Sequence, residues 1–141
     1  MKYVVDASVA LREVLPSPLT AKARALKADY LARVHELVAP DIFPAEIASA
    51  LTKAERQKLI SVGHGSAYYA KIASAWPVFS PYFPLTGRAM DISSQTRSSF
   101  LDCLYVILAE MEQVEFVTAD DKLVRNLQGR FPFVIHLATL P

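Results

Sequence analysis

The sequence has almost no cysteine, and an internal disulfide is impossible because Cys103 is the only thiol among its 141 residues. A chain without disulfides suits a reducing compartment. No apolar run reaches the roughly 18 residues that a membrane-spanning helix needs. The apolar N-terminal stretch is interrupted by Asp6, which is unlike the core of a signal peptide. We therefore expect a cytoplasmic protein with no signal peptide and no membrane segment.

The chain also lacks an excess of charge of either sign, internal repeats and long linkers. Its formal net charge at pH 7 is +1, so any contact with phosphates must come from a local patch and not from the field of the whole molecule. Hydrophobic residues make up 52% of the chain, which is enough for a real core. The length fits a single domain over residues 1–141.

Short β-branched or aromatic runs alternate with segments of helical periodicity. The predicted strands are Lys2–Asp6, Leu37–Ala39, Tyr82–Leu85, Val114–Thr118 and Phe133–Leu137. The predicted helices are Ser8–Leu15, an amphipathic segment with apolar positions from Leu19 to Leu37, a segment capped by Asp41 that ends near Leu59, one around Tyr68 to Trp76, Thr86–Ser94 with Thr86 as its cap, Phe100–Glu112 and Asp121–Leu127. This order predicts an α/β fold, a three-layer α/β/α sandwich with a short, mostly parallel sheet.

Most of the 14 acidic residues need no special explanation. Glu13 and Glu55, for example, stand beside basic residues and are expected on polar helix faces. Four other acids are different, because each is an isolated or terminal charge in an apolar segment, where an unpaired charge is costly to bury. These four are Asp6, Glu46, Asp102 and Asp120.

The predicted elements bring these four acids to one place. Asp6 and Asp120 follow strands, and parallel strands end at the same edge of a sheet. Glu46 and Asp102 lie in the first turns of helices, which begin at that edge. Two carboxylates about 4 Å apart repel by roughly 4 kcal/mol at an effective dielectric constant near 20. An all-oxygen cluster suits a hard divalent ion, Mg²⁺ or Mn²⁺, and the scattered histidines give no zinc spacing.

Local structure offers an alternative role for each acid. Asp6 could cap the helix that follows it, and the dipole of its helix could favour Glu46. Asp102 occupies the last position of a capping-box pattern, and one residue of the doublet Asp120-Asp121 could cap the last helix. Each alternative explains a single residue. Four such acids on a common edge favour the metal site.

Four stretches of the sequence resemble the motifs of PIN domains, in the order of that family. They are VVDASVAL, APDIFPAEIASAL, FLDCLYVILAE and FVTADDKL, and they span the chain from Val4 to about Leu127. Within the family the likeness is to VapC-like toxins, the endoribonucleases of toxin–antitoxin pairs. The resemblance implies that Asp6, Glu46, Asp102 and Asp120 hold the metal, with Ser8 and Thr118 as supporting hydroxyls. The neighbouring Asp121 leaves the identity of the fourth acid open, although the spacing from Thr118 favours Asp120.

The resemblance also implies an activity and partners. We expect a Mg²⁺-dependent endoribonuclease that cuts RNA, forms a homodimer and is silenced by a cognate antitoxin protein. Arg12 is a candidate contact for the substrate phosphate, with a surface salt bridge as the alternative. One rival is a catalytically silent PIN-like module that only binds RNA or protein. Another is a phosphohydrolase of the haloacid-dehalogenase type, which normally needs a second Asp at the position of Ser8.

Overall fold

Seven α-helices surround five strands in a computed structural model that describes the whole chain, Met1–Pro141. The strands are β1 (Lys2–Val5), β2 (Glu36–Pro40), β3 (Val78–Ser80), β4 (Glu115–Thr118) and β5 (Val134–His136). The helices are α1 (Ala7–Val14), α2 (Thr20–Leu31), α3 (Phe43–Arg56), α4 (His64–Ala73), α5 (Thr86–Thr96), α6 (Phe100–Glu112) and α7 (Asp121–Leu127), with short 3₁₀ turns η1 (Phe83–Leu85) and η2 (Leu137–Thr139). None of the helices combines the length and the hydropathy that crossing a membrane would require.

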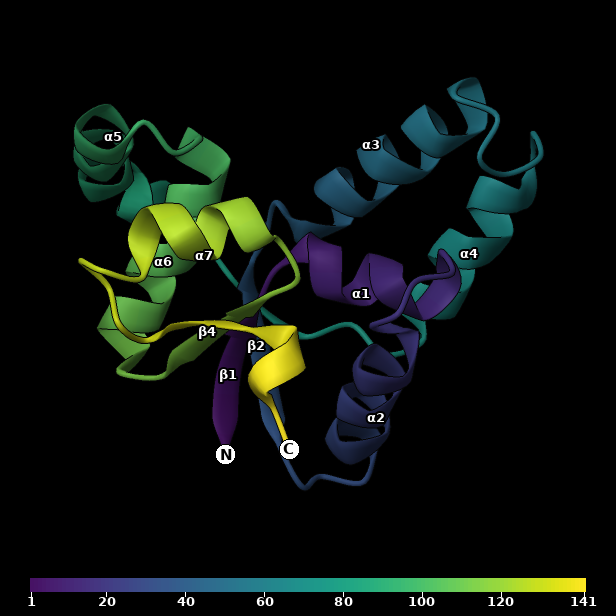
Figure 1. Cartoon of the computed structure of the whole chain (residues 1–141), viewed down its shortest axis with the longest axis horizontal. Coiled ribbons are helices and arrows are strands. Elements are labelled where there is room, and N and C mark those ends of the chain that lie inside the picture. The colour runs from purple at the N-terminus through teal and green to yellow at the C-terminus, as the bar shows by residue number, and fades with distance from the viewer.

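All five strands belong to one parallel sheet, in the order β3-β2-β1-β4-β5. The chain first builds outward from β1 through β2 to β3, and then returns across the sheet to build β4 and β5. Because parallel crossovers are right-handed, α1 to α4 cover one face of the sheet and α5 to α7 cover the other (Figure 1). The predicted three-layer α/β/α sandwich is therefore confirmed.

The direction of strand building reverses between β1 and β4, which are neighbours in the sheet. Such a reversal sends the chain to opposite faces after the two strands, so a crevice opens at their carboxyl ends. Ligands in open α/β sheets bind at this switch point. The topology thus singles out the turns that follow β1 and β4 as the place for a functional site.

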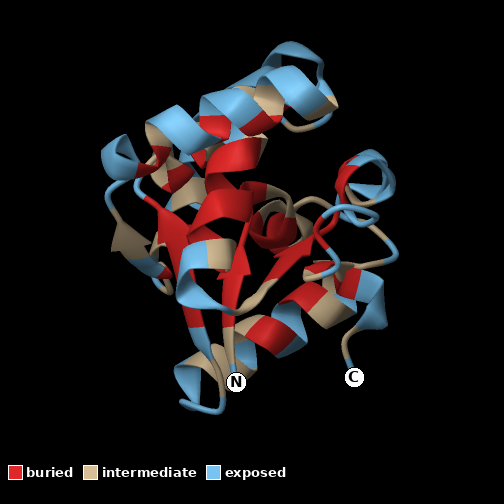
Figure 2. Ribbon diagram, turned by 90° about the vertical axis from the view of Figure 1, so that its left-hand side faces the viewer, coloured by how far each residue is buried: buried red, intermediate tan, exposed pale blue.

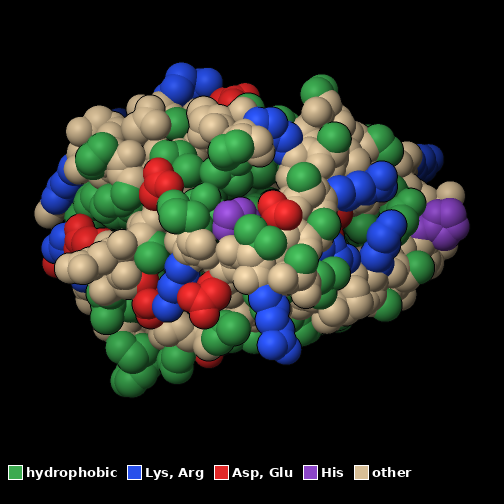
Figure 3. All heavy atoms as spheres, turned by 90° about the horizontal axis from the view of Figure 1, so that it is seen from below, with side chains coloured by type: hydrophobic (Ala, Val, Ile, Leu, Met, Phe, Trp, Pro, Cys, Tyr) green, Lys and Arg blue, Asp and Glu red, His purple; other side chains and the backbone are tan.

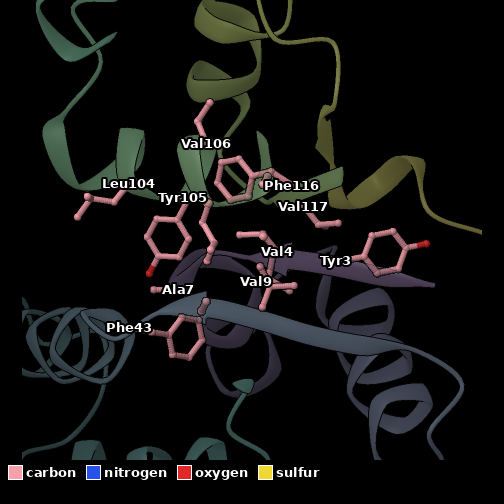
Figure 4. Packing of buried hydrophobic residues seen from close by; sticks show 14 of the residues in the cluster. Tyr3, Val4, Ala7, Val9, Phe43, Leu104, Tyr105, Val106, Phe116 and Val117 are labelled. Carbon is pink, nitrogen blue, oxygen red and sulfur yellow. The ribbon is translucent and has the colours of Figure 1, made fainter. Parts of the chain in front are cut away.

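The core lies on both faces of the central strands, as the buried residues in Figure 2 show. Val4 of β1 and Phe116 of β4 are completely buried. Helix α6 packs across β1, β2 and β4, and its seven consecutive residues Cys103–Ala109 are all buried. A helix that is apolar on every side is expected only inside a fold. Figure 4 shows Tyr105 and Val106 of this helix beside Phe116.

The third strand is Val78–Ser80, and not Tyr82–Leu85 as the sequence predicts. Val78–Ser80 follows Pro77 directly and pairs in parallel with Val38–Pro40 of β2. The segment Tyr82–Leu85 contains Pro84, which has no N–H to donate to a strand ladder. This segment forms the turn η1 instead.

The second helix ends at Leu31, well before Leu37, which the periodicity assigned to it. Arg33 adopts a left-handed backbone conformation with φ 62°, which stops the helix, and Val34 is exposed. Leu37 belongs to β2 and pairs with Tyr3 of β1. The helical spacing of these apolar residues therefore continued past the true end of the helix.

Neither Asp41 nor Thr86 caps a helix, in contrast to the prediction. The N-cap of α3 is Ile42, and Asp41 Oδ1 accepts a hydrogen bond of 3.0 Å from the amide of Tyr82. This bond ties the turn before α3 to the segment after β3. The N-cap of α5 is Leu85, because η1 runs directly into that helix.

Candidate functional site

Four isolated acids lie at the carboxyl edge of the sheet, around the switch point between β1 and β4. Asp6 follows β1 directly, and Asp120 follows β4 by way of Ala119. Glu46 lies in the first turn of α3 and Asp102 in the first turn of α6. In Figure 1 these helices begin on opposite sides of the sheet, with α3 on one side and α6 and α7 on the other.

Asp6 is buried and is held by hydroxyl groups from both sides of the switch point. The amide of Ser8 donates to Asp6 Oδ1 at 2.7 Å, and the Ser8 hydroxyl donates to the same oxygen. Thr118 Oγ1 donates to Asp6 Oδ2 at 2.6 Å. Asp6 therefore caps α1, as the alternative role requires, and its carboxylate is also fixed toward the end of β4.

The same two hydroxyls order the turn that carries Asp120. Ser8 Oγ accepts a hydrogen bond of 2.9 Å from the amide of Ala119, and Thr118 Oγ1 accepts one of 3.1 Å from the amide of Asp120. Asp120 Oδ1 in turn accepts from the amide of Leu123 at 3.1 Å, so Asp120 caps α7. Ser8 and Thr118 thus link the turns after β1 and β4 into one unit, which is the supporting position that the family resemblance implies for them.

Glu46 is held by a buried tyrosine of the opposite layer. The Tyr105 hydroxyl, on α6, donates to Glu46 Oε1 at 2.6 Å. Figure 4 shows the Tyr105 ring reaching from α6 past the sheet with its hydroxyl directed toward the side of Phe43, the first residue of α3. The ring also stacks on Phe116 of β4, with centroids 5.6 Å apart. The position of Glu46 is therefore set by a residue that the core itself holds in place.

Burial and mutual repulsion act on these carboxyl groups. Burial raises the pKa of Asp6 to about 6, against the hydroxyl hydrogen bonds that lower it, and the charge of Asp102 adds to the rise. Burial also raises the pKa of Glu46 to about 7, opposed by the Tyr105 hydroxyl and reinforced by the charges of Asp6 and Asp102. Without a bound cation, both groups therefore lose their protons at a higher pH than an ordinary carboxyl group does.

Asp102 and Asp120 also repel each other electrostatically. Burial raises the pKa of Asp102, the Ser99 hydroxyl lowers it, and the charge of Asp120 raises it again. Ser99 Oγ accepts a hydrogen bond of 3.1 Å from the amide of Asp102, which is one half of the predicted capping box. Asp102 and Asp120 also line the same polar hollow. Each of the four acids is thus coupled to at least one of the others.

The donor set fits a hard divalent cation. None of the four acids belongs to any of the five ion pairs of the chain, so no side-chain cation compensates them. Carboxylate oxygens without such compensation are the ligands that Mg²⁺ and Mn²⁺ prefer. No three Asp, Glu, His or Cys side chains are already drawn together around one point. The acids would therefore have to turn toward a common ion on binding it.

Two residues of the predicted site lie apart from this cluster. Asp121 is exposed, and its Oδ1 lies 2.9 Å from Nε2 of His136, at the end of β5. Arg12 lies in the last turn of α1 and forms no ion pair, so the alternative of a surface salt bridge is wrong. Its charge is not among the causes that shift the pKa of Asp6. The geometry therefore favours Asp120 over Asp121 and gives Arg12 no contact with the acids.

Sequence reasoning missed three polar residues of this region. Tyr105 follows Asp102 by one helical turn, and that spacing could have identified it. Arg97 and Lys122 line the hollow that contains Asp102 and Asp120, but they come from α5 and α7. Only the tertiary fold brings these two cations together.

Comparison with known protein families gives a match over most of the chain. A family model described as "PIN domain" matches residues 3–126, which is most of the chain. The chain belongs to the PIN-domain family. PIN domains are typically nucleases and generally bind divalent metal. The match leaves the haloacid-dehalogenase-type alternative without support.

A solved structure shows the same fold. The crystal structure of PAE2754 from Pyrobaculum aerophilum matches with a TM-score of 0.68 and 21% sequence identity, over 99% of this chain and 94% of that chain. At that identity the likeness concerns the fold of the PIN domain alone. No curated protein matches the sequence.

Proposed function

We propose that this PIN domain is a Mg²⁺-dependent endoribonuclease that hydrolyses RNA phosphodiester bonds. The observation that carries the proposal is the group of four uncompensated carboxylates, from Asp6, Glu46, Asp102 and Asp120, around the switch point of the sheet. A protein that only bound RNA would gain nothing from this repulsion. A cation that these carboxylates hold would bring the phosphodiester and the attacking water together.

The position of each residue suggests its role in the reaction. Asp6, Asp102 and Asp120 would be direct ligands of the ion, and a bound Mg²⁺ (or Mn²⁺) would supply charge stabilisation at the phosphate and lower the pKa of the attacking water. Ser8 and Thr118 would hold the Asp6 carboxylate in its ionised form, because both hydroxyls donate to it.

Glu46 is suited to the proton-transfer role. Its pKa of about 7 is close to neutral pH, where a general base is most effective. The Tyr105 hydroxyl occupies Oε1 and leaves Oε2 to orient the water and accept its proton. The water oxygen would bond to phosphorus while the bond to O3′ breaks, and O3′ would leave with a proton from solvent. The products would be a 5′-phosphate and a 3′-hydroxyl.

The finer role that we propose is that of a toxin in a toxin–antitoxin pair, acting in the cytoplasm as a homodimer and restrained by a cognate antitoxin protein. The four sequence motifs and their likeness to VapC-like toxins support this role. Co-expression with the product of a short reading frame beside the gene would test it. Growth arrest by this chain alone, relieved by the neighbouring product, is the expected result.

Incubation of the purified chain with total RNA tests the activity directly. We expect cleavage in Mg²⁺ and none in excess chelator, with fragments that carry 5′-phosphates. A binding measurement on the same samples separates the enzyme from the silent PIN-like module. RNA binding without cleavage at any Mg²⁺ or Mn²⁺ concentration would establish the silent module instead.

A further inference from the structure

A polar hollow opens beside the acid cluster, between α5, α6 and α7. Asp102 and Asp120 line it on the side of the acids, and Arg97 and Lys122 also face it. Its volume of about 570 Å³ lies within the range of small-molecule sites, roughly 300–1,000 Å³. Only one of its lining residues is hydrophobic. The hollow is therefore unsuited to an apolar ligand and suited to a charged one.

The two cations of the hollow have no acidic partner. Neither Arg97 nor Lys122 takes part in any of the five ion pairs of the chain. They come from different elements, Arg97 from the C-cap of α5 and Lys122 from α7. Two free cations beside the proposed metal ligands are placed to receive an anion that also reaches the acids.

The segment that carries Arg97 is fixed from several sides. The Asn126 side-chain amide donates to Ser98 Oγ at 2.6 Å and to the carbonyl oxygen of Thr96 at 3.1 Å. Ser93 Oγ donates to the carbonyl oxygen of Ser98 at 2.7 Å. Arg97 itself has a φ of 60°, a left-handed conformation that is uncommon for a residue with a side chain. The hydrogen bonds to the residues on both sides hold this backbone in place. The Arg97 side chain therefore extends from an ordered part of the chain.

From these features we infer that the hollow binds a backbone phosphate of single-stranded RNA next to the scissile phosphate, with Arg97 and Lys122 as its contacts. The inference rests on the proposed function, because it assumes that the bond to be cut lies at the acid cluster. A guanidinium matches the paired oxygens of a phosphate, and an ammonium adds a second charge. The contact would position the strand and would leave the chemical step to the acids.

The test compares two arginines in the same backbone conformation. Arg97→Asn removes the charge and keeps a residue type that tolerates a left-handed φ. Arg33→Asn is the matched control, because Arg33 has a φ of 62°, is also exposed and lies at the opposite, amino edge of the sheet. The control for Lys122→Gln is Lys58→Gln, which also removes one exposed positive charge and lies just past the far end of α3. The probe is a fluorescently labelled single-stranded RNA hexamer, measured by anisotropy in chelator over a series of salt concentrations.

We expect Arg97→Asn to weaken hexamer binding about tenfold and Lys122→Gln about threefold. The slope of log affinity against log salt should fall by about 0.7 for each lost phosphate contact. In cleavage assays with Mg²⁺, Arg97→Asn should raise KM and leave kcat nearly unchanged, as expected for a contact made equally before and during reaction. The two controls should match the unaltered chain.

Equal effects at Arg97 and Arg33, no effect at Arg97, or no binding of the hexamer by the unaltered chain would each overturn the inference. The endoribonuclease proposal fails separately, if the unaltered chain binds the hexamer but does not cut RNA in Mg²⁺ or Mn²⁺. In that case, weaker binding by Arg97→Asn would still support the hollow as a phosphate site.

Discussion

The two edges of the parallel sheet differ in whether their acidic side chains form ion pairs. At the amino edge two acids lie beside basic side chains: Lys2 Nζ lies 2.7 Å from Glu112 Oε2, and His35 Nε2 lies 3.6 Å from Asp29 Oδ2. Figure 3 looks onto this end of the molecule, where basic, acidic and apolar side chains are interspersed. At the carboxyl edge the four acids around the switch point form no ion pair. Acidic side chains therefore form surface ion pairs at the amino edge. At the carboxyl edge they leave unpaired negative charge, which a metal ion would neutralise.

The largest expected difference between the edges is in catalysis. Asp6→Asn should reduce RNA cleavage at least about 10³-fold, because losing several kcal/mol of metal-dependent stabilisation slows a reaction by that factor. The matched control is Asp121→Asn, which changes the same functional group in an exposed acid that lies beside His136. It should retain activity within about twofold, as expected for a surface substitution away from the site. A comparable loss in both variants would mean that Asp121 belongs to the site.

The next difference is in stability without metal. The pKa of Asp6 rises from 3.8 to about 6 on folding, so the fold favours the protonated carboxyl group. That contribution is fully present below pH 3.8 and is lost as the pH rises through about 6. Asp6→Asn should therefore stabilise the metal-free chain by about 3 kcal/mol at pH 8, since the pKa rises by about two units on folding and one pKa unit corresponds to about 1.4 kcal/mol.

Urea unfolding in chelator at pH 4 and pH 8 would measure this effect. The advantage of Asp6→Asn should shrink toward zero at pH 4. If the variant is less stable than the unaltered chain at pH 8, burial of the Asp6 charge is not the cost that the structure indicates.

A smaller effect is expected from the tyrosine that holds Glu46. Tyr105→Phe removes the hydrogen bond that lowers the pKa of Glu46, so that pKa should rise further above its value of about 7. The acidic limb of the pH profile of kcat/KM should move to higher pH, and stability should fall by about 1 kcal/mol. Tyr3→Phe is the control, because Tyr3 is a buried tyrosine of β1 whose hydroxyl makes no hydrogen bond to a side chain of the acid cluster. An unchanged profile in Tyr105→Phe would remove Glu46 from the proton-transfer role.

The smallest effect belongs to the amino edge. Lys2→Met breaks the ion pair with Glu112. The side chains of Lys2 and Glu112 are 34% and 36% exposed. Exposed ion pairs contribute little, so we expect a loss of about 0.5 kcal/mol or less, reduced further by salt. Urea unfolding at low and high salt would check this. If Lys2→Met lowered the free energy of unfolding by as much as Asp6→Asn changes it, charge pairing would not distinguish the two edges.

The sequence predicted the parts of the fold that local patterns determine. The helix Phe100–Glu112 and the helix Asp121–Leu127 have the predicted bounds, because each begins after a capping side chain and is followed by a clear break. The edge of the sheet that carries the four acids also followed from the order of strands and helices. Strand β3 was missed because its three residues, VFS, contain only two strand-forming side chains, whereas the equally short β5 lies inside the longer apolar run Phe133–Leu137.

Features that depend on tertiary contacts were beyond the sequence. Glu13 stands beside Arg12 in the chain but is buried, and Lys27 of α2 is its partner at 3.5 Å. Glu55 was expected on a polar face, and it accepts hydrogen bonds from the amides of Gly63 and Gly65 at the start of α4. In both cases the nearest charge in sequence is not the partner in space, since helix packing decides which side chains meet.

The central claim is that Asp6, Asp102 and Asp120 at the carboxyl edge hold a divalent ion, with Glu46 beside it. The most direct measurement is a crystal structure of the chain soaked in Mn²⁺, with anomalous diffraction data. We predict an anomalous peak bounded by carboxylate oxygens of Asp6, Asp102 and Asp120, with Glu46 next to it and Asp121 outside its coordination sphere. An occupied Mn²⁺ site elsewhere and no peak among these four side chains would contradict it.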